Sequence, residues 1–271
     1  MPSEFAAAKI NLALHLLRRR GDGYHDLETV FAFANFGDTL TAAPADALSL
    51  TITGPFSDAA GAGDDNLVLR AARALAYAAG VRSGAALALE KHIPVAAGLG
   101  GGSADAAAAL RLLSRLWGLD WPLRRLTALA AVLGSDVPAC VASRTCFGSG
   151  RGEALAPWPD SVAGTPLLLV NPGVAVPTGP VFAGWDGIDR GGIAPGADLA
   201  ALRNDMTDAA VGLAPVIADV LGALAATDPL LARMSGSGAT CLALYADTAA
   251  RDRAAAMVDP RGWWQAATTI R

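Results

Sequence analysis

One stretch of this sequence decides how the chain folds: Pro94-Val95-Ala96-Ala97-Gly98-Leu99-Gly100-Gly101-Gly102-Ser103-Ala104-Asp105. Apolar residues follow it at helical spacing as far as Trp117, and Gly118 is typical of a helix C-terminus. Glycine adds no side chain to a core and costs backbone entropy when it is ordered, so these glycines need a backbone role. A glycine-rich loop at a helix N-terminus presents N–H groups at the positive end of the helix dipole, which favours phosphate. We therefore predict a phosphate-binding loop, with an ordinary tight turn as the alternative.

Two common phosphate-binding motifs do not describe this loop. The P-loop requires a lysine directly after its last glycine, and here Ser103 follows Gly102. The dinucleotide-binding fingerprint fits only as Gly98-x-Gly100, because Ser103 takes the place of the third glycine. The acidic residue Asp120 also follows a helix instead of a strand. The loop therefore predicts phosphate binding of another kind.

Composition predicts a globular protein that acts on a small molecule. The chain has 271 residues, 53% of them hydrophobic, and a net charge of −4, which argues against a basic nucleic-acid-binding face. Its three cysteines form no C-x-x-C pair, so we expect reduced thiols and no disulfide. We find no signal-peptide pattern and no run of about twenty apolar residues, so we predict a cytoplasmic protein that binds neither membrane nor nucleic acid.

The N-terminal segment predicts a β-hairpin. Apolar residues alternate over residues 5–16, which is typical of a half-buried strand and places Lys9 and Asn11 on one face. Residues 18–23 predict a turn, and a second extended segment covers residues 24–33. Lys9 and Lys91 are the only lysines among 21 basic residues. The residues alone fit Lys9 either as a group of a phosphate or proton-transfer site or as a charge that protects an edge strand.

The order of the remaining elements favours an α+β class, with strands first and then a strand, the loop and a helix. We expect strands at residues 39–42, 48–53, 87–91, 167–171, 240–246 and 263–270, and helices at residues 66–79, 104–117, 122–133, 198–205, 208–226 (with breaks near Gly212 and Pro215) and from 248. Glycines and prolines after residue 148 indicate a domain boundary, and the second half alternates helices and strands as in a ferredoxin-like layer.

Asp136 has two interpretations. An aspartate directly before a helix whose first turn contains a proline, Pro138, is typical of an N-cap. A carboxylate at a helix start can also act as the base of a phosphoryl transfer. On the residues alone, the N-cap is favoured.

Six short segments, taken in order, carry a resemblance to a known family. The first three are Ala8-Lys9-Ile10-Asn11-Leu12, the loop over residues 94–103 and Ser235-Gly236-Ser237-Gly238-Ala239. They resemble the motifs of the GHMP superfamily, the galactokinase, homoserine, mevalonate and phosphomevalonate kinases. The other three are Gly21-Asp22-Gly23-Tyr24-His25, Gly134-Ser135-Asp136-Val137-Pro138 and Asn204-Asp205. They resemble the branch that phosphorylates 4-diphosphocytidyl-2-C-methyl-D-erythritol in the non-mevalonate route to isoprenoid (terpenoid) precursors.

This resemblance implies a two-domain, α+β GHMP-kinase fold. An N-terminal domain like ribosomal protein S5, over residues 1–152, would bind ATP. A ferredoxin-like C-terminal domain would cover residues 153–271, and the active site would lie in the cleft between the two. The implied reaction transfers a phosphoryl group from ATP to the 2-hydroxyl of the cytidine substrate and gives ADP.

The resemblance also implies the residues of the site. It makes Lys9 and Asp136 catalytic and makes Mg²⁺ a bridge between the phosphates, with Ser103 as a ligand. ATP would be bound by Pro94, Val95, Ala96, Ala97, Gly98, Leu99, Gly100, Gly101, Gly102, Ser103 and Ala104, with Asn66 near the adenine. The cytidine diphosphate part of the substrate would be bound by Asn11, Tyr24, His25, Thr178 and Phe182.

Some residues depart from the family pattern, and some alternatives stay open. Residues 95–97 read Val-Ala-Ala where methionine and glycine are more usual, and Ala104 replaces a second serine, which puts the metal ligands in doubt. Without the resemblance, His25 reads as a surface turn residue and Phe182 as a core aromatic. The rival functions are a mevalonate or homoserine kinase, a nucleotide-binding protein without catalysis and, more remotely, a dinucleotide-dependent oxidoreductase.

Overall fold

The computed structural model describes residues 1–159 and 162–271 and divides into two compact units that are interleaved along the chain. Unit 1 comprises residues 1–9, 37–95 and 100–143, and unit 2 comprises residues 10–36, 96–99 and 144–271. The long strands β1 (Ser3–Arg19) and β2 (His25–Ala45) pass through both units. A single cut after residue 152 therefore does not separate the units, and the predicted boundary between the two family domains stays a prediction.

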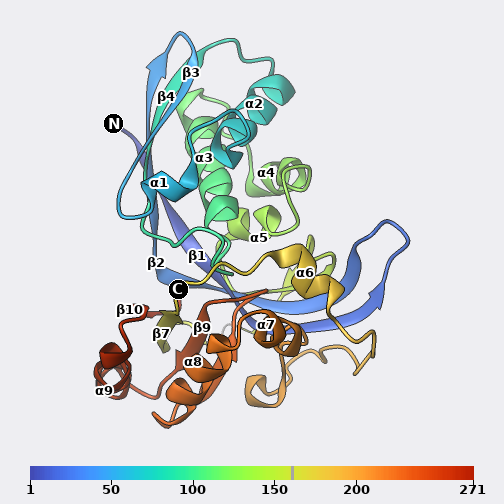
Figure 1. Ribbon diagram of the computed structural model, residues 1–271. Coiled ribbons are helices and arrows are strands. Elements are labelled where there is room, and N and C mark those ends of the chain that lie inside the picture. Colours follow the sequence, from blue (N-terminus) through green and yellow to red (C-terminus); the bar gives the residue numbers. More distant parts are fainter. Residues whose placement is uncertain (160–161) are drawn as a thin grey trace. The chain divides into compact units, whose positions relative to one another are not determined.

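Unit 1 is a sheet with helices packed against it (Figure 1). The second half of β2 pairs antiparallel with β4 (Gly84–Glu90), which pairs parallel with β3 (Leu48–Thr53). The helices are α1 (Ser57–Ala60), α2 (Leu67–Ala79), α3 (Gly101–Leu116), α4 (Leu123–Ala130) and α5 (Val137–Ala142). Residues 106–110 of α3 are fully buried, so this alanine-rich helix packs closely against its neighbours. The glycine-rich loop thus leads into a largely buried helix.

Unit 2 contains an antiparallel sheet in the order β10-β7-β9-β8. Its strands are β7 (Pro166–Asn171), β8 (Leu231–Met234), β9 (Cys241–Leu244) and β10 (Trp264–Thr269). Its helices are α6 (Thr178–Ala183), η1 (Leu199–Ala201), α7 (Thr207–Leu213), α8 (Val216–Ala225), α9 (Thr248–Val258) and η2 (Asp259–Arg261). The first half of β2 pairs with β5 (Cys146–Gly150), which pairs with β6 (Ala154–Pro157). This arrangement agrees with the α+β class.

Most predicted elements are confirmed, and the errors have physical reasons. The predicted hairpin forms, and the segments expected at residues 24–33 and 39–42 are parts of the single strand β2. The predicted helix at residues 198–205 is wrong, because only η1 is helical and Asn204 instead forms a β-bridge with Leu14. Strands β5, β6 and β8 were not predicted. Gly148 of β5 reads as a linker residue, yet a Cβ there would lie 2.7 Å from the Phe31 ring, so close packing requires the glycine.

Among the described residues, no helix has both the length and the apolar character needed to cross a bilayer. The three cysteines are buried free thiols.

Candidate active site

An ion pair between Lys9 and Asp136 forms the centre of the candidate site in unit 1. Lys9 Nζ lies 3.0 Å from Asp136 Oδ2; the Lys9 side chain is 5% exposed and that of Asp136 is 33% exposed. A buried, paired lysine is not the solvated charge that protects an edge strand. Asp136 stands at the start of α5, but its side chain makes no capping hydrogen bond. The geometry therefore contradicts the N-cap interpretation of Asp136.

Gly100 brings the glycine-rich loop against this ion pair. Its backbone has a φ of 60°, and a Cβ at this position would lie 2.9 Å from Lys9 Cε and 3.9 Å from Asp136 Oδ2. Any larger residue would separate the loop from the pair. Helix α3 starts at the next residue, which leaves the N–H groups of Gly101, Gly102 and Ser103 without acceptors inside the helix. These donors and the helix dipole suit a phosphate group beside Lys9 and Asp136.

A second loop, over residues 234–239, holds the middle of the glycine-rich loop within unit 2. Ser235 Oγ donates to the carbonyl of Gly98 over 2.9 Å, and Thr240 N donates to that of Ala97 over 3.2 Å. A Cβ at Gly98 would lie 2.4 Å from the Ser235 carbonyl oxygen, so this contact requires glycine. Ala96 has a φ of 54°, a conformation that is uncommon for a residue other than glycine and typical of functional loops. The sequence identified both loops but not this contact.

Three aromatic rings meet in unit 2. The His25 ring stacks on Phe182 at a centroid distance of 5.1 Å and meets Trp185 edge-on at 5.6 Å. Burial and the nearby Arg19 lower the pKa of His25, so its imidazole is neutral at pH 7. His25 Nε2 and Trp185 Nε1 are buried and have no hydrogen-bond partner among the described residues. Trp185 was not predicted, since an isolated aromatic in a glycine-rich segment gives no periodic signal.

The other predicted substrate residues also lie in unit 2. Asn11 Nδ2 donates to Thr29 Oγ1 over 2.8 Å, and Thr178 Oγ1 lies 2.9 Å from Ser237 Oγ in the second loop. Tyr24 is 53% exposed, with the guanidinium of Arg151 5.0 Å from its ring centroid.

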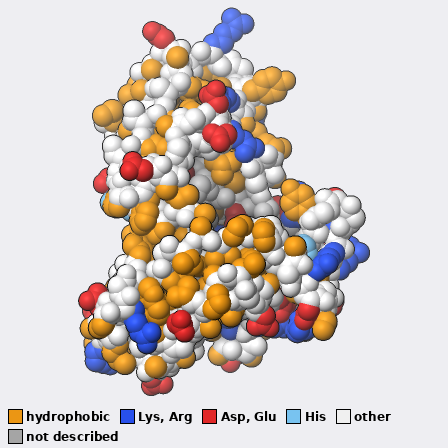
Figure 2. Space-filling model, in the orientation of Figure 1, with side chains coloured by type: hydrophobic (Ala, Val, Ile, Leu, Met, Phe, Trp, Pro, Cys, Tyr) orange, Lys and Arg blue, Asp and Glu red, His pale blue; other side chains and the backbone are white. Residues whose placement is uncertain are grey.

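Helix α6 positions two of the predicted substrate residues, Thr178 and Phe182. Figure 2 shows hydrophobic side chains gathered over this helix, where Pro180 and Ala183 are exposed. The aromatic cluster therefore adjoins an apolar surface of unit 2.

The Asn204-Asp205 segment has a structural role in unit 2. Asn204 Nδ2 donates to the carbonyls of Met234 and Gly236, each over 2.8 Å, and so holds the second loop. Asp205 Oδ2 accepts a hydrogen bond from Leu16 N over 2.8 Å.

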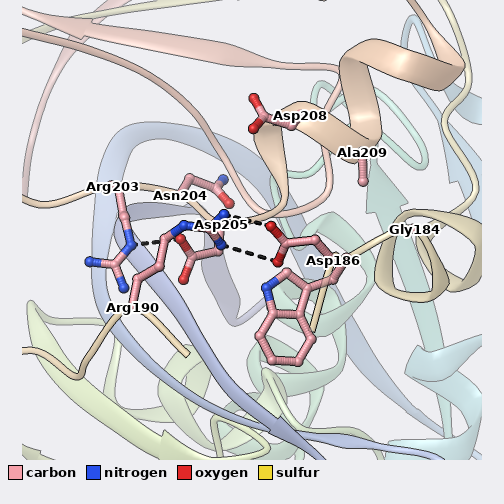
Figure 3. Close-up of a pocket in the computed structure, with 9 residues that line it drawn as sticks. Gly184, Asp186, Arg190, Arg203, Asn204, Asp205, Asp208 and Ala209 are labelled. Carbon is pink, nitrogen blue, oxygen red and sulfur yellow. Dashed lines mark hydrogen bonds and ion pairs between the residues drawn. The ribbon is translucent and has the colours of Figure 1, made fainter. Parts of the chain in front are cut away.

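Both residues line a cavity of about 270 Å³ (Figure 3). It is framed by the ion pairs Arg203–Asp205, at 2.6 Å, and Arg190–Asp186, at 2.5 Å. Each ion pair lies within one segment, the first before α7 and the second after α6. Arg203 Nη2 joins the two segments by donating to the carbonyl of Gly191 over 2.8 Å.

Both polar atoms of the Asn66 side chain form hydrogen bonds with backbone groups nearby in the sequence. Its Oδ1 accepts from Val68 N over 2.8 Å and caps α2, while its Nδ2 donates to the carbonyl of Gly61 over 2.7 Å. A place beside adenine stays a prediction for this residue.

The Mg²⁺ ion stays a prediction for this site. The described residues contain no cluster of three or more His, Cys, Asp or Glu side chains that could hold a metal. Mg²⁺ bound to a nucleotide takes most of its ligands from phosphates and water, so a partly exposed hydroxyl such as that of Ser103 is sufficient.

Comparison with known proteins gives one consistent family. The family model "GHMP kinases N terminal domain" matches residues 66–144, and "GHMP kinases C terminal" matches residues 188–262. A 4-diphosphocytidyl-2-C-methyl-D-erythritol kinase from Rhizorhabdus wittichii is 54% identical, with 100% of this chain and 95% of that protein aligned. The protein of the same name from Novosphingobium aromaticivorans is 51% identical, covering 99% of this chain and 92% of its own length.

Two solved structures are similar to this chain. A crystal structure of 4-(cytidine 5'-diphospho)-2C-methyl-D-erythritol kinase has a TM-score of 0.81 and 33% identity over 99% of both chains. Mevalonate kinase from L. major, at 16% identity and a TM-score of 0.72 over 100% of this chain and 96% of its own, shares the fold.

Proposed function

Since the chain belongs to the 4-diphosphocytidyl-2-C-methyl-D-erythritol kinase family of GHMP kinases, we propose that it transfers the γ-phosphoryl group of ATP to the 2-hydroxyl of 4-diphosphocytidyl-2-C-methyl-D-erythritol. The chain is a kinase, and ATP is its co-substrate. The observation that carries the proposal is the Lys9–Asp136 ion pair next to Gly100. The proposed base, the lysine ammonium group and the proposed phosphate-binding N–H groups all belong to unit 1.

Asp136 is the proposed base. Its carboxylate is one-third exposed and therefore open to a substrate hydroxyl, whose proton it accepts as the oxygen attacks the γ-phosphorus. Lys9 pairs with this carboxylate and offsets the negative charge on the phosphoryl group during its transfer. Catalysis then comes from the positioning of the two substrates and from electrostatic stabilisation of the transferred group, as in other phosphoryl transfers.

The glycine-rich loop is the proposed phosphate site. The N–H groups of residues 101–103 bind phosphate oxygens at the N-terminus of α3, and Gly100 lets those oxygens approach Lys9. Mg²⁺, when bound, neutralises phosphate charge, with Ser103 as its proposed protein ligand.

The aromatic cluster is the proposed cytidine site. Neutral His25 has a buried ring nitrogen without a partner among the described residues, and such a group can form a hydrogen bond with the polar edge of a base. Phe182 and Tyr24 supply aromatic faces, and Asn11 and Thr178 supply polar contacts. Mevalonate and homoserine have no base that would use these rings.

A substrate panel tests the proposal. Release of ADP is measured with ATP, Mg²⁺ and one alcohol at a time: the cytidine substrate, mevalonate or homoserine. We expect turnover only with the cytidine substrate. Turnover of mevalonate or homoserine would identify a different kinase, and a lack of ADP release with every alcohol would favour a nucleotide-binding protein without catalysis.

The variant His25→Ala tests the cytidine site. It should raise the KM for the cytidine substrate about tenfold or more and leave the KM for ATP unchanged, because a site built around a hydrogen bond discriminates strongly. An equal rise in both constants would contradict the role of His25.

A further inference from the structure

Arg111 is a mostly buried arginine within the apolar stretch of α3, in unit 1. Its side chain is 12% exposed. Nε donates to Glu4 Oε1 over 2.7 Å, and Nη2 donates to the carbonyl of Phe5 over 3.2 Å. Nη1 donates to the carbonyls of Cys140 and Val141, over 2.7 and 3.3 Å. One guanidinium group therefore joins α3 to the start of β1 and to the end of α5.

The two elements that Arg111 joins to α3 are those that carry the ion pair of the candidate site. Lys9 follows Phe5 by four residues on β1, which is about 13 Å along a strand. Asp136 directly precedes α5, and its carbonyl accepts a hydrogen bond from Cys140 N over 3.1 Å, so one helical turn separates it from the contact with Arg111. The position of Lys9 and that of Asp136 thus both depend on elements held by one side chain.

Helix α5 needs such outside contacts because it is short. It has six residues, and a helix of that length is not stable by itself in water. The last carbonyls of any helix have no donors inside the helix. Arg111 donates to two of these carbonyls in α5 and places a positive charge at the negative end of the helix dipole. The arginine therefore stabilises α5 in one position against α3.

Arg115, one turn further along α3, provides a comparison within the same helix. It also forms an ion pair with Glu4, but its side chain is 50% exposed. Its Nη2 donates to Glu4 and to the carbonyl of Ser3, and both of these partners belong to β1. The two arginines thus share a helix and a carboxylate partner, and they differ in the hydrogen bonds of Arg111 to α5.

We propose that Arg111 is a positioning residue for phosphoryl transfer, which holds β1 and α5 so that Lys9 and Asp136 meet in the geometry that the reaction requires. This inference rests on the proposed roles of Lys9 and Asp136. A displacement of about 1 Å, even one caused far from the reacting atoms, can slow a transfer step about 100-fold. The N–H groups at the start of α3 and the aromatic cluster are not bonded to Arg111. Loss of Arg111 should therefore lower kcat and leave the KM for each substrate nearly unchanged.

The experiment measures steady-state ADP release with ATP, Mg²⁺ and the cytidine substrate for Arg111→Lys, alone and combined with Asp136→Asn. Lysine keeps the charge, but its single nitrogen does not replace the three nitrogens of a planar guanidinium group. We expect Arg111→Lys to lower kcat about tenfold or more and to change each KM by less than about threefold. In the Asp136→Asn background, the same substitution should lower kcat by less than about twofold, because Arg111 acts through Asp136. Arg115→Lys is the matched control and should keep the kcat of the unaltered protein.

Three results would overturn the inference: an unchanged kcat in Arg111→Lys, a loss of kcat that is as large in the Asp136→Asn background, or the same loss in Arg115→Lys. Circular dichroism checks that each variant folds. If Arg111→Lys does not fold, Glu4→Ala decides in the same cycle, since it removes the carboxylate that holds Arg111 Nε and should lower kcat about threefold or more only while Asp136 is present. A lack of ADP release by the unaltered protein would instead refute the proposed function, so the two failures are distinguishable.

Discussion

Replacing Asp136 by asparagine should almost abolish turnover while the protein stays folded and binds ATP. Asparagine has nearly the shape of aspartate but cannot accept the proton of the substrate hydroxyl. A general base contributes about 10²- to 10⁴-fold to a rate, so kcat should fall by that factor. The KM for ATP should change little, because the loop N–H groups and Gly100 are untouched.

The cost of this change to folding should be much smaller than its cost to catalysis. Asp136 is 33% exposed, so solvent screens its interaction with Lys9. We expect a loss of about 1 kcal/mol in the free energy of unfolding, which lowers Tm by about 2–4 °C. Asp247→Ala is the matched control: Asp247 Oδ1 accepts a hydrogen bond from Ala250 N and caps α9, so its loss also costs about 1 kcal/mol.

A steady-state ADP-release assay and a thermal melt on both variants test the reasoning. Asp247→Ala should melt earlier and keep its kcat, whereas Asp136→Asn should lose its kcat at a similar Tm. If Asp136→Asn kept a kcat within tenfold of the unaltered protein, Asp136 would not be the base.

Three further predictions concern the loops and the response to pH. Gly100→Ala should raise the KM for ATP and lower kcat, each more than tenfold in steady-state kinetics, because its Cβ would lie 2.9 Å from Lys9 Cε; unchanged kinetics would contradict the tight approach. Asn204→Ala should cost about 2–4 kcal/mol in denaturant unfolding, since it leaves buried carbonyls of the second loop without donors, and a loss below about 0.5 kcal/mol would count against that role. Burial and Arg203 lower the pKa of His15, so below about pH 6.5 the unfolded chain binds a proton that the folded chain does not. Stability should therefore fall as the pH decreases from 7 to 5, and His15→Gln should weaken this dependence in melts at several pH values.

Local chemistry decides which parts of the fold could be predicted from the sequence. The glycine-rich loop was predictable because consecutive ordered glycines are costly and need a backbone reason. Helix α2 was predictable because its two ends carry standard signals, Asn66 and Gly80. The helix expected at residues 198–205 failed because a bridge between Asn204 and Leu14, residues far apart in the sequence, overrides local propensity.

The roles of the site residues could not be predicted from their neighbours in the sequence alone. An aspartate before a helix with an early proline favours a cap on the residues alone. The missing capping hydrogen bond and the 3.0 Å contact with Lys9, which favour the proposed base, depend on the tertiary structure. Trp185 gave no signal, because its role depends on the His25 ring, which comes from another part of the sequence.

The use of lysine in a chain that otherwise relies on arginine follows from the loop geometry. A Cβ at Gly100 would lie 2.9 Å from Lys9 Cε, and one at Gly101 would lie 2.9 Å from Lys91 Nζ. Each lysine therefore places a slim chain or a compact ammonium group against loop backbone, where the broad, planar guanidinium of arginine would force the backbone away. Each lysine is also paired with a buried or half-buried aspartate, which keeps its positive charge in place. The same steric requirement explains both the glycines of the loop and the lysines beneath them, so a larger residue on either side should disrupt the same contact.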